Sequence, residues 1–246
     1  MQLPLYFISD IHLNLNRNPG EVKRQEHLFS FFRHIGKTGG TLFIVGDLFD
    51  FYFEYPDVIP KTYFEFYRQL ATLKDRGIEL HYLLGNHDYW GMKFIRSILM
   101  DKVYPRDTII RSGDSKIYLT HGDGILSWDY SYRVLKTVLQ HPWFIAFYRW
   151  IHPTVGYAFA RLIANRQKNY PHSEDYNSKV RTEMTAFAAR RIQEGADAVI
   201  TGHYHQAVEI GVAKGKLIIL GDWIRLFTYA IFDGHELQLR SWDSHA

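Results

Sequence analysis

The sequence predicts a single α/β domain built from a mainly parallel sheet with helices packed outside it, and three observations support this fold class. Short apolar runs alternate along the chain with longer segments whose apolar residues recur at helical spacing. The chain has 246 residues, 46% hydrophobic and 22% charged, which suits one globular domain with a large core. Motifs rich in histidine and aspartate follow the apolar runs, where strands are expected to end. The alternation of strand and helix favours βαβ units.

The apolar runs are short and bounded by polar residues, as is typical of strands buried on both faces. Six such strands are expected, at Leu5–Ile8, Leu42–Val45, Leu80–Leu84, Ile117–Leu119, Ala198–Ile200 and Leu217–Leu220. Helical spacing predicts four helices between them, at about Val22–Ile35, Pro60–Arg76, Lys93–Met100 and Ser173–Glu194. Turn residues at Lys214-Gly215 and Asp233-Gly234 indicate antiparallel hairpins late in the chain, and therefore a second sheet.

The composition excludes several classes of protein. There are no cysteines, so disulfides, zinc–thiolate sites and a thiol nucleophile are excluded. The sequence lacks the basic start and following apolar stretch of a signal peptide, so none is expected. The longest stretch without Asp, Glu, Lys or Arg is the 12 residues Thr137 to Tyr148, whereas a spanning helix needs about 20 apolar residues. We therefore expect a cytoplasmic protein. A net charge of +3 is too mild to indicate nucleic acid as a partner.

Each of five polar motifs comes directly after a predicted strand. The motifs are Asp10-Ile11-His12, Gly46-Asp47, Gly85-Asn86-His87-Asp88, His121-Gly122-Asp123 and Gly202-His203-Tyr204-His205. In open α/β sheets, ligands bind at the carboxyl ends of the strands, because the loops converge there. The motifs are therefore expected to meet in one site.

The side chains of these motifs are ligands for metal ions. Asp10 and His12 are expected to lie on the same side of an extended segment, because side chains alternate along a strand, and His203 and His205 repeat that spacing. Asp47 can offer both carboxylate oxygens and so bridge two ions. Asn86 adds a neutral oxygen and His121 another imidazole. Nitrogen and oxygen ligands without sulfur suit Mn, Fe, Zn or Mg, and a pair of such ions can activate water for attack at phosphorus.

With these motifs in this order, from Asp10 to His205, the chain resembles the calcineurin-like metallophosphoesterase superfamily. The resemblance implies a four-layer α/β/β/α sandwich and two divalent ions, most often Mn. One ion would be held by Asp10, His12, Asp47 and His205, and the other by Asp47, Asn86, His121 and His203. His87 would stand beside the scissile phosphate as a catalytic residue, with Asp88 fixing its tautomer and raising its pKa.

An insertion at about residues 128–172 is expected to form a helical lid on the single domain. Its 44 residues from Tyr130 to Ser173 contain no Asp or Glu but several basic and aromatic side chains, Trp143 and Phe147 among them. Such a segment suits an anionic substrate with an apolar part, or docking on an anionic membrane surface. The aromatic residues also suit the core of a small helical cap, and that interpretation stays open.

The insertion, with further motifs, resembles the family of UDP-2,3-diacylglucosamine pyrophosphatases of lipid A synthesis. The shared motifs are Gly46-Asp47-Leu48-Phe49-Asp50, His121-Gly122-Asp123, Asp129, His141-Pro142-Trp143 and Leu220-Gly221-Asp222-Trp223. The resemblance implies a glycolipid-nucleotide substrate, acyl chains under the lid and a peripheral position on the inner membrane. The substrate contacts would be Asn86, His87, Asp129, Arg166, Lys168 and Asn169. Many members of that family carry arginine where this chain has His87.

The sequence leaves three alternative functions. A dinuclear-metal phosphoesterase for a soluble nucleotide, phosphodiester or phosphoprotein would need no acyl-sized pocket under the lid. A binding module that had lost catalysis is expected to have lost ligands, yet all seven ligand residues and His87 are present. Nucleic-acid cleavage would require a strongly salt-dependent affinity for DNA.

Overall fold

Two β-sheets form the centre of the molecule in the computed structural model, which describes residues 1–88, 93–128, 141–164 and 173–243. The first sheet has six strands in the order β11-β10-β1-β2-β3-β4. Its parallel strands are β1 (Leu5–Ile8), β2 (Thr41–Val45), β3 (Glu79–Leu83) and β4 (Lys102–Tyr104). The hairpin of β10 (Thr228–Phe232) and β11 (Leu237–Ser241) adds to the other side of β1 in antiparallel register.

The second sheet has five strands in the order β5-β6-β7-β9-β8. Three parallel strands form its centre, β6 (Ser115–Thr120), β7 (Ala198–Thr201) and β9 (Gly215–Ile219). The edges are the antiparallel strands β5 (Thr108–Ser112) and β8 (Val208–Val212). The predicted second sheet and the hairpin turns at Lys214-Gly215 and Asp233-Gly234 are thus confirmed.

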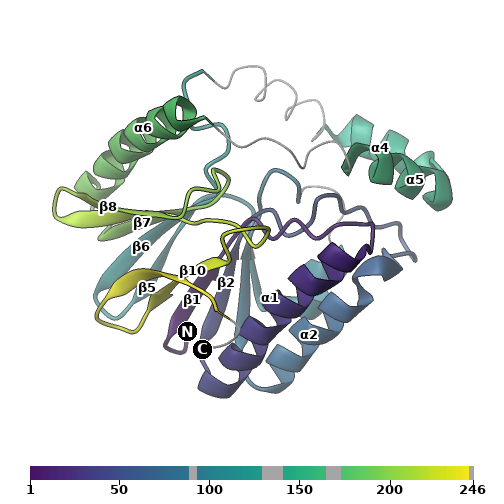
Figure 1. Cartoon of the computed structure of the whole chain (residues 1–246), viewed down its shortest axis with the longest axis horizontal. Coiled ribbons are helices and arrows are strands. Elements are labelled where there is room, and N and C mark those ends of the chain that lie inside the picture. Colours follow the sequence, from purple (N-terminus) through teal and green to yellow (C-terminus); the bar gives the residue numbers. More distant parts are fainter. Residues whose placement is uncertain (89–92, 129–140, 165–172, 244–246) are drawn as a thin grey trace.

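Helices cover the outer faces of both sheets and complete the predicted four layers (Figure 1). Helices α1 (Pro19–Thr38) and α2 (Phe64–Asp75), the latter preceded by the 3-10 turn η1 (Lys61–Tyr63), lie on the first sheet. Helix α6 (Glu174–Gln193) lies on the second sheet. The start of α1 is set locally, because the Asn18 side chain accepts from the Glu21 amide and Pro19 occupies the first turn.

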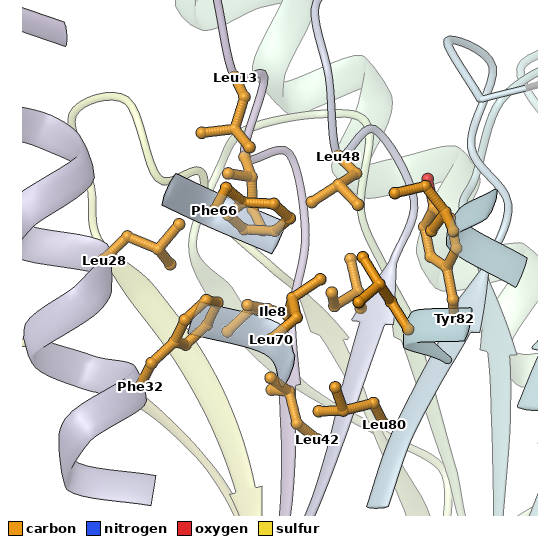
Figure 2. Packing of buried hydrophobic residues seen from close by; sticks show 14 of the residues in the cluster. Ile8, Leu13, Leu28, Phe32, Leu42, Leu48, Phe66, Leu70, Leu80 and Tyr82 are labelled. Carbon is orange, nitrogen blue, oxygen red and sulfur yellow. The ribbon is translucent and has the colours of Figure 1, made fainter. Parts of the chain in front are cut away.

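Strand alternation explains how one short strand serves two cores. Ile8 of β1 packs toward α1 and α2 with Phe32 and Leu70 (Figure 2), whereas its neighbour Phe7 packs between the sheets with Phe43. Both faces are buried, so these strands read as continuous apolar runs rather than as alternating ones.

Two parts of the secondary structure differ from the prediction. The segment Lys93–Met100 contains a short π-helical turn, η2 (Ile95–Leu99), rather than a regular helix over the whole range. Strands β4 and β5 were not predicted. Both lie at sheet edges and are partly exposed, so their polar residues hide the apolar signal that identified the central strands.

Helices α4 (Pro142–Trp150) and α5 (Pro153–Ala164) form a separate pair beyond the carboxyl ends of the first sheet's strands, on the side of α1 and α2 (Figure 1). The pair contacts the loop after β2, where the Tyr157 hydroxyl donates a hydrogen bond to the Phe53 carbonyl. The Tyr148 ring packs on Phe53 with 4.6 Å between centroids. Within the described ranges, no helix combines the length and apolarity that crossing a bilayer demands.

Candidate metal centre

The loops that carry the five motifs are joined to one another at the carboxyl edge of the two sheets. The Asp10 amide donates to the Gly46 carbonyl at 3.2 Å, and the His12 amide donates to the Asp47 carbonyl at 3.0 Å. In the second sheet, the Gly202 amide donates to the His121 carbonyl at 3.1 Å. The two sheets are linked because the His203 amide donates to the Asp10 carboxylate at 2.8 Å. The expected convergence of the motifs in one place is therefore observed.

Three motif glycines are required by close packing inside this centre. A Cβ atom on Gly46 would lie 2.2 Å from Nδ1 of His121, and one on Gly85 would lie 2.3 Å from Oδ1 of Asp47. A Cβ on Gly202 would lie 2.8 Å from Oδ2 of Asp10. The glycines therefore let backbone approach the ligand side chains, and they do more than mark turns.

The ligand residues reach the centre through left-handed backbone rather than through strand alternation. In the part of the chain that the structure describes, eight non-glycine residues have positive φ, and five of them are predicted ligands: Asp10, His12, Asp47, His203 and His205. The expected extended geometry of Asp10–His12 and His203–His205 is therefore wrong. Each left-handed residue costs about 1–3 kcal/mol, and such strain concentrates at functional sites.

A first cluster is formed by Asp10, His12 and His205. Oδ1 of Asp10 lies 3.7 Å from Nε2 of His12 and 3.4 Å from Nε2 of His205. This oxygen is buried and accepts no hydrogen bond, whereas Oδ2 of the same carboxylate accepts from Ser9 and from the His203 amide. A buried carboxylate oxygen without a donor, flanked by two imidazole nitrogens, fits a bound cation.

A second cluster is formed by Asp47, His121 and His203, with Asn86 beside it. Nε2 of His121 lies 3.0 Å from Oδ1 of Asn86 and 3.3 Å from Oδ2 of Asp47. The same Asp47 oxygen lies 3.7 Å from Nε2 of His12 in the first cluster. Oδ1 of Asp47 instead accepts from the His87 amide. Oδ2 of Asp47 therefore lies between the two clusters, while Oδ1 is turned toward the His87 amide.

The outer nitrogens of three histidines are each held by an acceptor. Nδ1 of His12 lies 3.3 Å from Oδ1 of Asp50, and Nδ1 of His121 lies 2.9 Å from the Val45 carbonyl. Nδ1 of His205 lies 3.1 Å from Oδ2 of Asp222. A proton on each Nδ1 leaves Nε2 with a lone pair that faces the centre, which is the arrangement of metal-binding histidines. The donor set thus fits two divalent ions with oxygen and nitrogen ligands.

The charges of the cluster are strongly coupled. Burial raises the pKa of Asp47, but the charges of His121 and His87 outweigh it and hold the pKa well below its usual range. Burial lowers the pKa of His121, but the Asp47 carboxylate raises it to about 10. Burial and the charge of His121 lower the pKa of His203 to about 4. Asp47 is thus ionised and His203 neutral at neutral pH, the forms in which each binds a metal, whereas His121 is protonated in the metal-free centre and gives up a proton when a metal binds.

The structure gives His87 a different partner from the one expected. Nδ1 of His87 lies 2.9 Å from the backbone carbonyl of Asp50. The Asp88 carboxylate is buried and accepts from the backbone amides of Asp47, Leu48 and Gly85. The prediction that Asp88 fixes the tautomer of His87 is therefore wrong, because this carboxylate joins two ligand-bearing loops. Burial raises the pKa of Asp88 to about 6.

The sequence does not assign Asp50 and Asp222 a role in the site, although both belong to motifs that the chain shares with the pyrophosphatase family. The signal available was their position in loops at the carboxyl ends of strands, since Asp50 lies in the loop after β2 that carries Asp47, and Asp222 lies in the loop after β9. The predicted substrate contacts Asp129, Arg166, Lys168 and Asn169 lie outside the described residues.

The chain is similar to several known proteins. A family model described as calcineurin-like phosphoesterase matches residues 3–207. The chain is 30% identical over 257 residues to the UDP-2,3-diacylglucosamine hydrolase of Porphyromonas gingivalis, and the match covers 98% of each chain. It is 27% identical to the hydrolase of the same name from Aeromonas hydrophila, over 88% of this chain and 89% of that one. A solved archaeal phosphodiesterase superposes with a TM-score of 0.48 and 14% identity, over 97% of this chain and 99% of that one.

Proposed function

Because the chain belongs to the calcineurin-like phosphoesterase family, we propose that it hydrolyses the pyrophosphate bond of UDP-2,3-diacylglucosamine in lipid A biosynthesis. The products are UMP and 2,3-diacylglucosamine 1-phosphate. The assignment of the substrate rests on the near full-length match to the Porphyromonas gingivalis hydrolase. The two buried ligand clusters support hydrolysis at phosphorus independently of that match.

In this function, Asp10, His12 and His205 hold one ion, and Asn86, His121 and His203 hold the other, with Asp47 between them. The bound ions supply Lewis-acid activation of water and neutralisation of charge at phosphorus. The donors, which are carboxylate and amide oxygens and imidazoles, accept Mn, Fe, Zn or Mg. Among these we propose Mn, the metal that the family resemblance implies most often.

His87 acts on the leaving group. Its ring stands 5.1 Å from the ring of His12, measured between centroids, and its Nδ1 is held by the Asp50 carbonyl. The carbonyl accepts the proton on Nδ1, so Nε2 is the nitrogen left to face the departing oxygen, and it can donate a proton there when the ring is doubly protonated. The His87 amide also donates to Asp47, so the residue and the carboxylate between the ions are fixed relative to one another.

The helix pair α4–α5 covers the apolar part of the substrate and docks the enzyme on the membrane surface. Trp143, Phe147 and Trp150 of α4 are 81%, 65% and 90% exposed, although large apolar side chains are costly to leave in water. Arg149 and Arg161 lie on the same pair of helices and suit an anionic surface. In this proposal, the enzyme lies on the cytoplasmic side of the inner membrane, where it meets a diacylated substrate.

The test of the substrate is hydrolysis of UDP-2,3-diacylglucosamine by the purified full chain in Mn, with UMP release followed over time. We expect rapid release that a chelator abolishes and added Mn restores. Cleavage of a generic phosphodiester without UMP release would contradict the lipid substrate and favour a soluble phosphoester instead.

A double substitution in α4, Trp143→Ser with Phe147→Ser, is expected to lower turnover of the diacylated substrate at least about tenfold. Each apolar side chain that the bound acyl chains bury contributes about 1.5–3 kcal/mol to substrate binding. Turnover of a small chromogenic phosphodiester is expected to stay within about twofold. Ile98→Ser is the control, because Ile98 is 58% exposed but lies on η2, outside the helix pair. Equal losses on both substrates would mean that the two aromatic residues only maintain the fold.

A further inference from the structure

Arg24 of α1 is a largely buried cation that reaches the backbone of two loops at the metal centre. Its Nη1 donates to the carbonyls of Ile11 and Trp223, the latter at 2.9 Å, and its Nη2 donates to the His12 carbonyl at 3.0 Å. Ile11 and His12 belong to the first motif, which carries Asp10, and Trp223 follows β9 in the second sheet. One guanidinium therefore joins the two segments.

Glu21 fixes the direction of this guanidinium from one turn earlier on α1. Its carboxylate accepts from Nη2 of Arg24 at 2.7 Å and from Nε at 3.0 Å. The Glu21 side chain is only 2% exposed and also accepts from the Asn14 amide and the Gln25 side chain. Because burying an ion pair rarely adds net stability, its value here is geometric: the planar fork presents its donors in fixed directions.

Asp222 holds the same region from the other side. Oδ2 lies 3.1 Å from Nδ1 of His205, and Oδ1 accepts from the amides of Ile224, Arg225 and Leu226. The amide of Trp223, the residue that follows Asp222, donates to the Asp10 carbonyl at 3.1 Å. Asp222 thus orients a ligand of the first cluster, and its loop is bonded to the backbone of another.

The second cluster is held by different groups. The Val45 carbonyl orients His121, and Asp88 holds the amides of Asp47 and Gly85. Arg24 instead donates to the segment of the first motif and to the Trp223 carbonyl, and the Asp222 carboxylate contacts the ligand His205. The two clusters share Asp47, but the groups that orient the other ligands of each cluster differ.

We propose that Arg24 and Asp222 are positioning residues for the ion held by Asp10, His12 and His205, and that they set its affinity independently of the other ion. This inference rests on the two-ion centre of the proposed function. Removing a group that orients a histidine ligand lowers metal affinity about 10–100-fold. A change at Arg24 or Asp222 is therefore expected to weaken one of the two ions.

The experiment compares Arg24→Lys and Asp222→Asn with the wild-type chain by calorimetric titration of Mn into metal-free protein. Lysine at position 24 keeps the positive charge but lacks the planar guanidinium with its several donors. Asparagine at position 222 keeps an oxygen that can accept from the backbone amides of its loop. The control is Arg68→Lys, because Arg68 and Glu65 of α2 form a pair of the same spacing on an exposed surface. His205→Ala marks the step that belongs to the first cluster.

We expect the wild type and Arg68→Lys to bind two ions. Arg24→Lys and Asp222→Asn are expected to retain one ion at wild-type affinity and to bind the other about 10–100-fold more weakly. The weakened step is expected to be the one that His205→Ala removes, and excess Mn is expected to restore most of kcat. Two unchanged steps, or an equal loss at both, would overturn the proposal. A wild-type chain that binds two ions but releases no UMP would instead contradict only the proposed substrate.

Discussion

Replacing Asp47 with alanine is expected to remove at least one metal ion and to lower hydrolysis at least about 10³-fold, because Lewis-acid stabilisation of several kcal/mol is lost. Oδ2 of Asp47 faces Nε2 of both His12 and His121, at 3.7 and 3.3 Å. Among the carboxylate–histidine pairs of the described residues, this oxygen alone faces histidines of both clusters. The measurement is metal content after gel filtration, together with the rate of UMP release.

Asp47→Asn separates the bridging role from a structural one. Asparagine keeps an oxygen that accepts from the His87 amide, as Oδ1 of Asp47 does at 3.0 Å, but it lacks the negative charge between the ions. We expect this variant to fold with the wild-type melting temperature and still to lose metal and activity. An Asp47→Ala enzyme with wild-type turnover would show that Asp47 does not lie between the ions.

The sequence predicts which residues meet in the site better than it predicts how they meet. Parallel strands end at a common edge, so a motif after each strand is enough to place Asp10, Asp47 and His121 together. The left-handed backbone of Asp10 and His12 is not encoded by residue type, because aspartate and histidine adopt it only where tertiary contacts hold them. The spacing of two residues therefore suggested a strand where the chain turns.

Supporting residues are harder to predict than ligands for a related reason. Asp88 follows His87 directly, yet its carboxylate turns away to bind backbone amides of another loop. Arg24 lies on a helix outside every motif and 199 positions before Trp223, and only the packing of α1 on the first sheet brings it to the Trp223 carbonyl. Contacts of this kind depend on tertiary structure, so neither periodicity nor motif spacing reports them.

Replacing His87 with alanine is expected to leave both ions bound and to lower the rate roughly 10²–10⁴-fold, the usual contribution of a general acid or base. Nδ1 of His87 donates to a carbonyl, so Nε2 is free to face the leaving oxygen, and the doubly protonated ring can give it a proton. The loss is expected to shrink for a substrate with a good leaving group, such as a nitrophenyl phosphodiester, because that oxygen needs no proton.

His235→Ala is the matched control, since His235 is an exposed histidine in the turn between β10 and β11, and we expect it to keep wild-type activity. The readouts are metal content and rates on both substrates. His87 also lies close enough to His12 and Asp47 to share an ion with them. If His87→Ala loses metal, His87 is a ligand and the general-acid role is wrong. If both ions stay and the rate falls equally on the two substrates, His87 stabilises charge on phosphorus rather than protonating the leaving group.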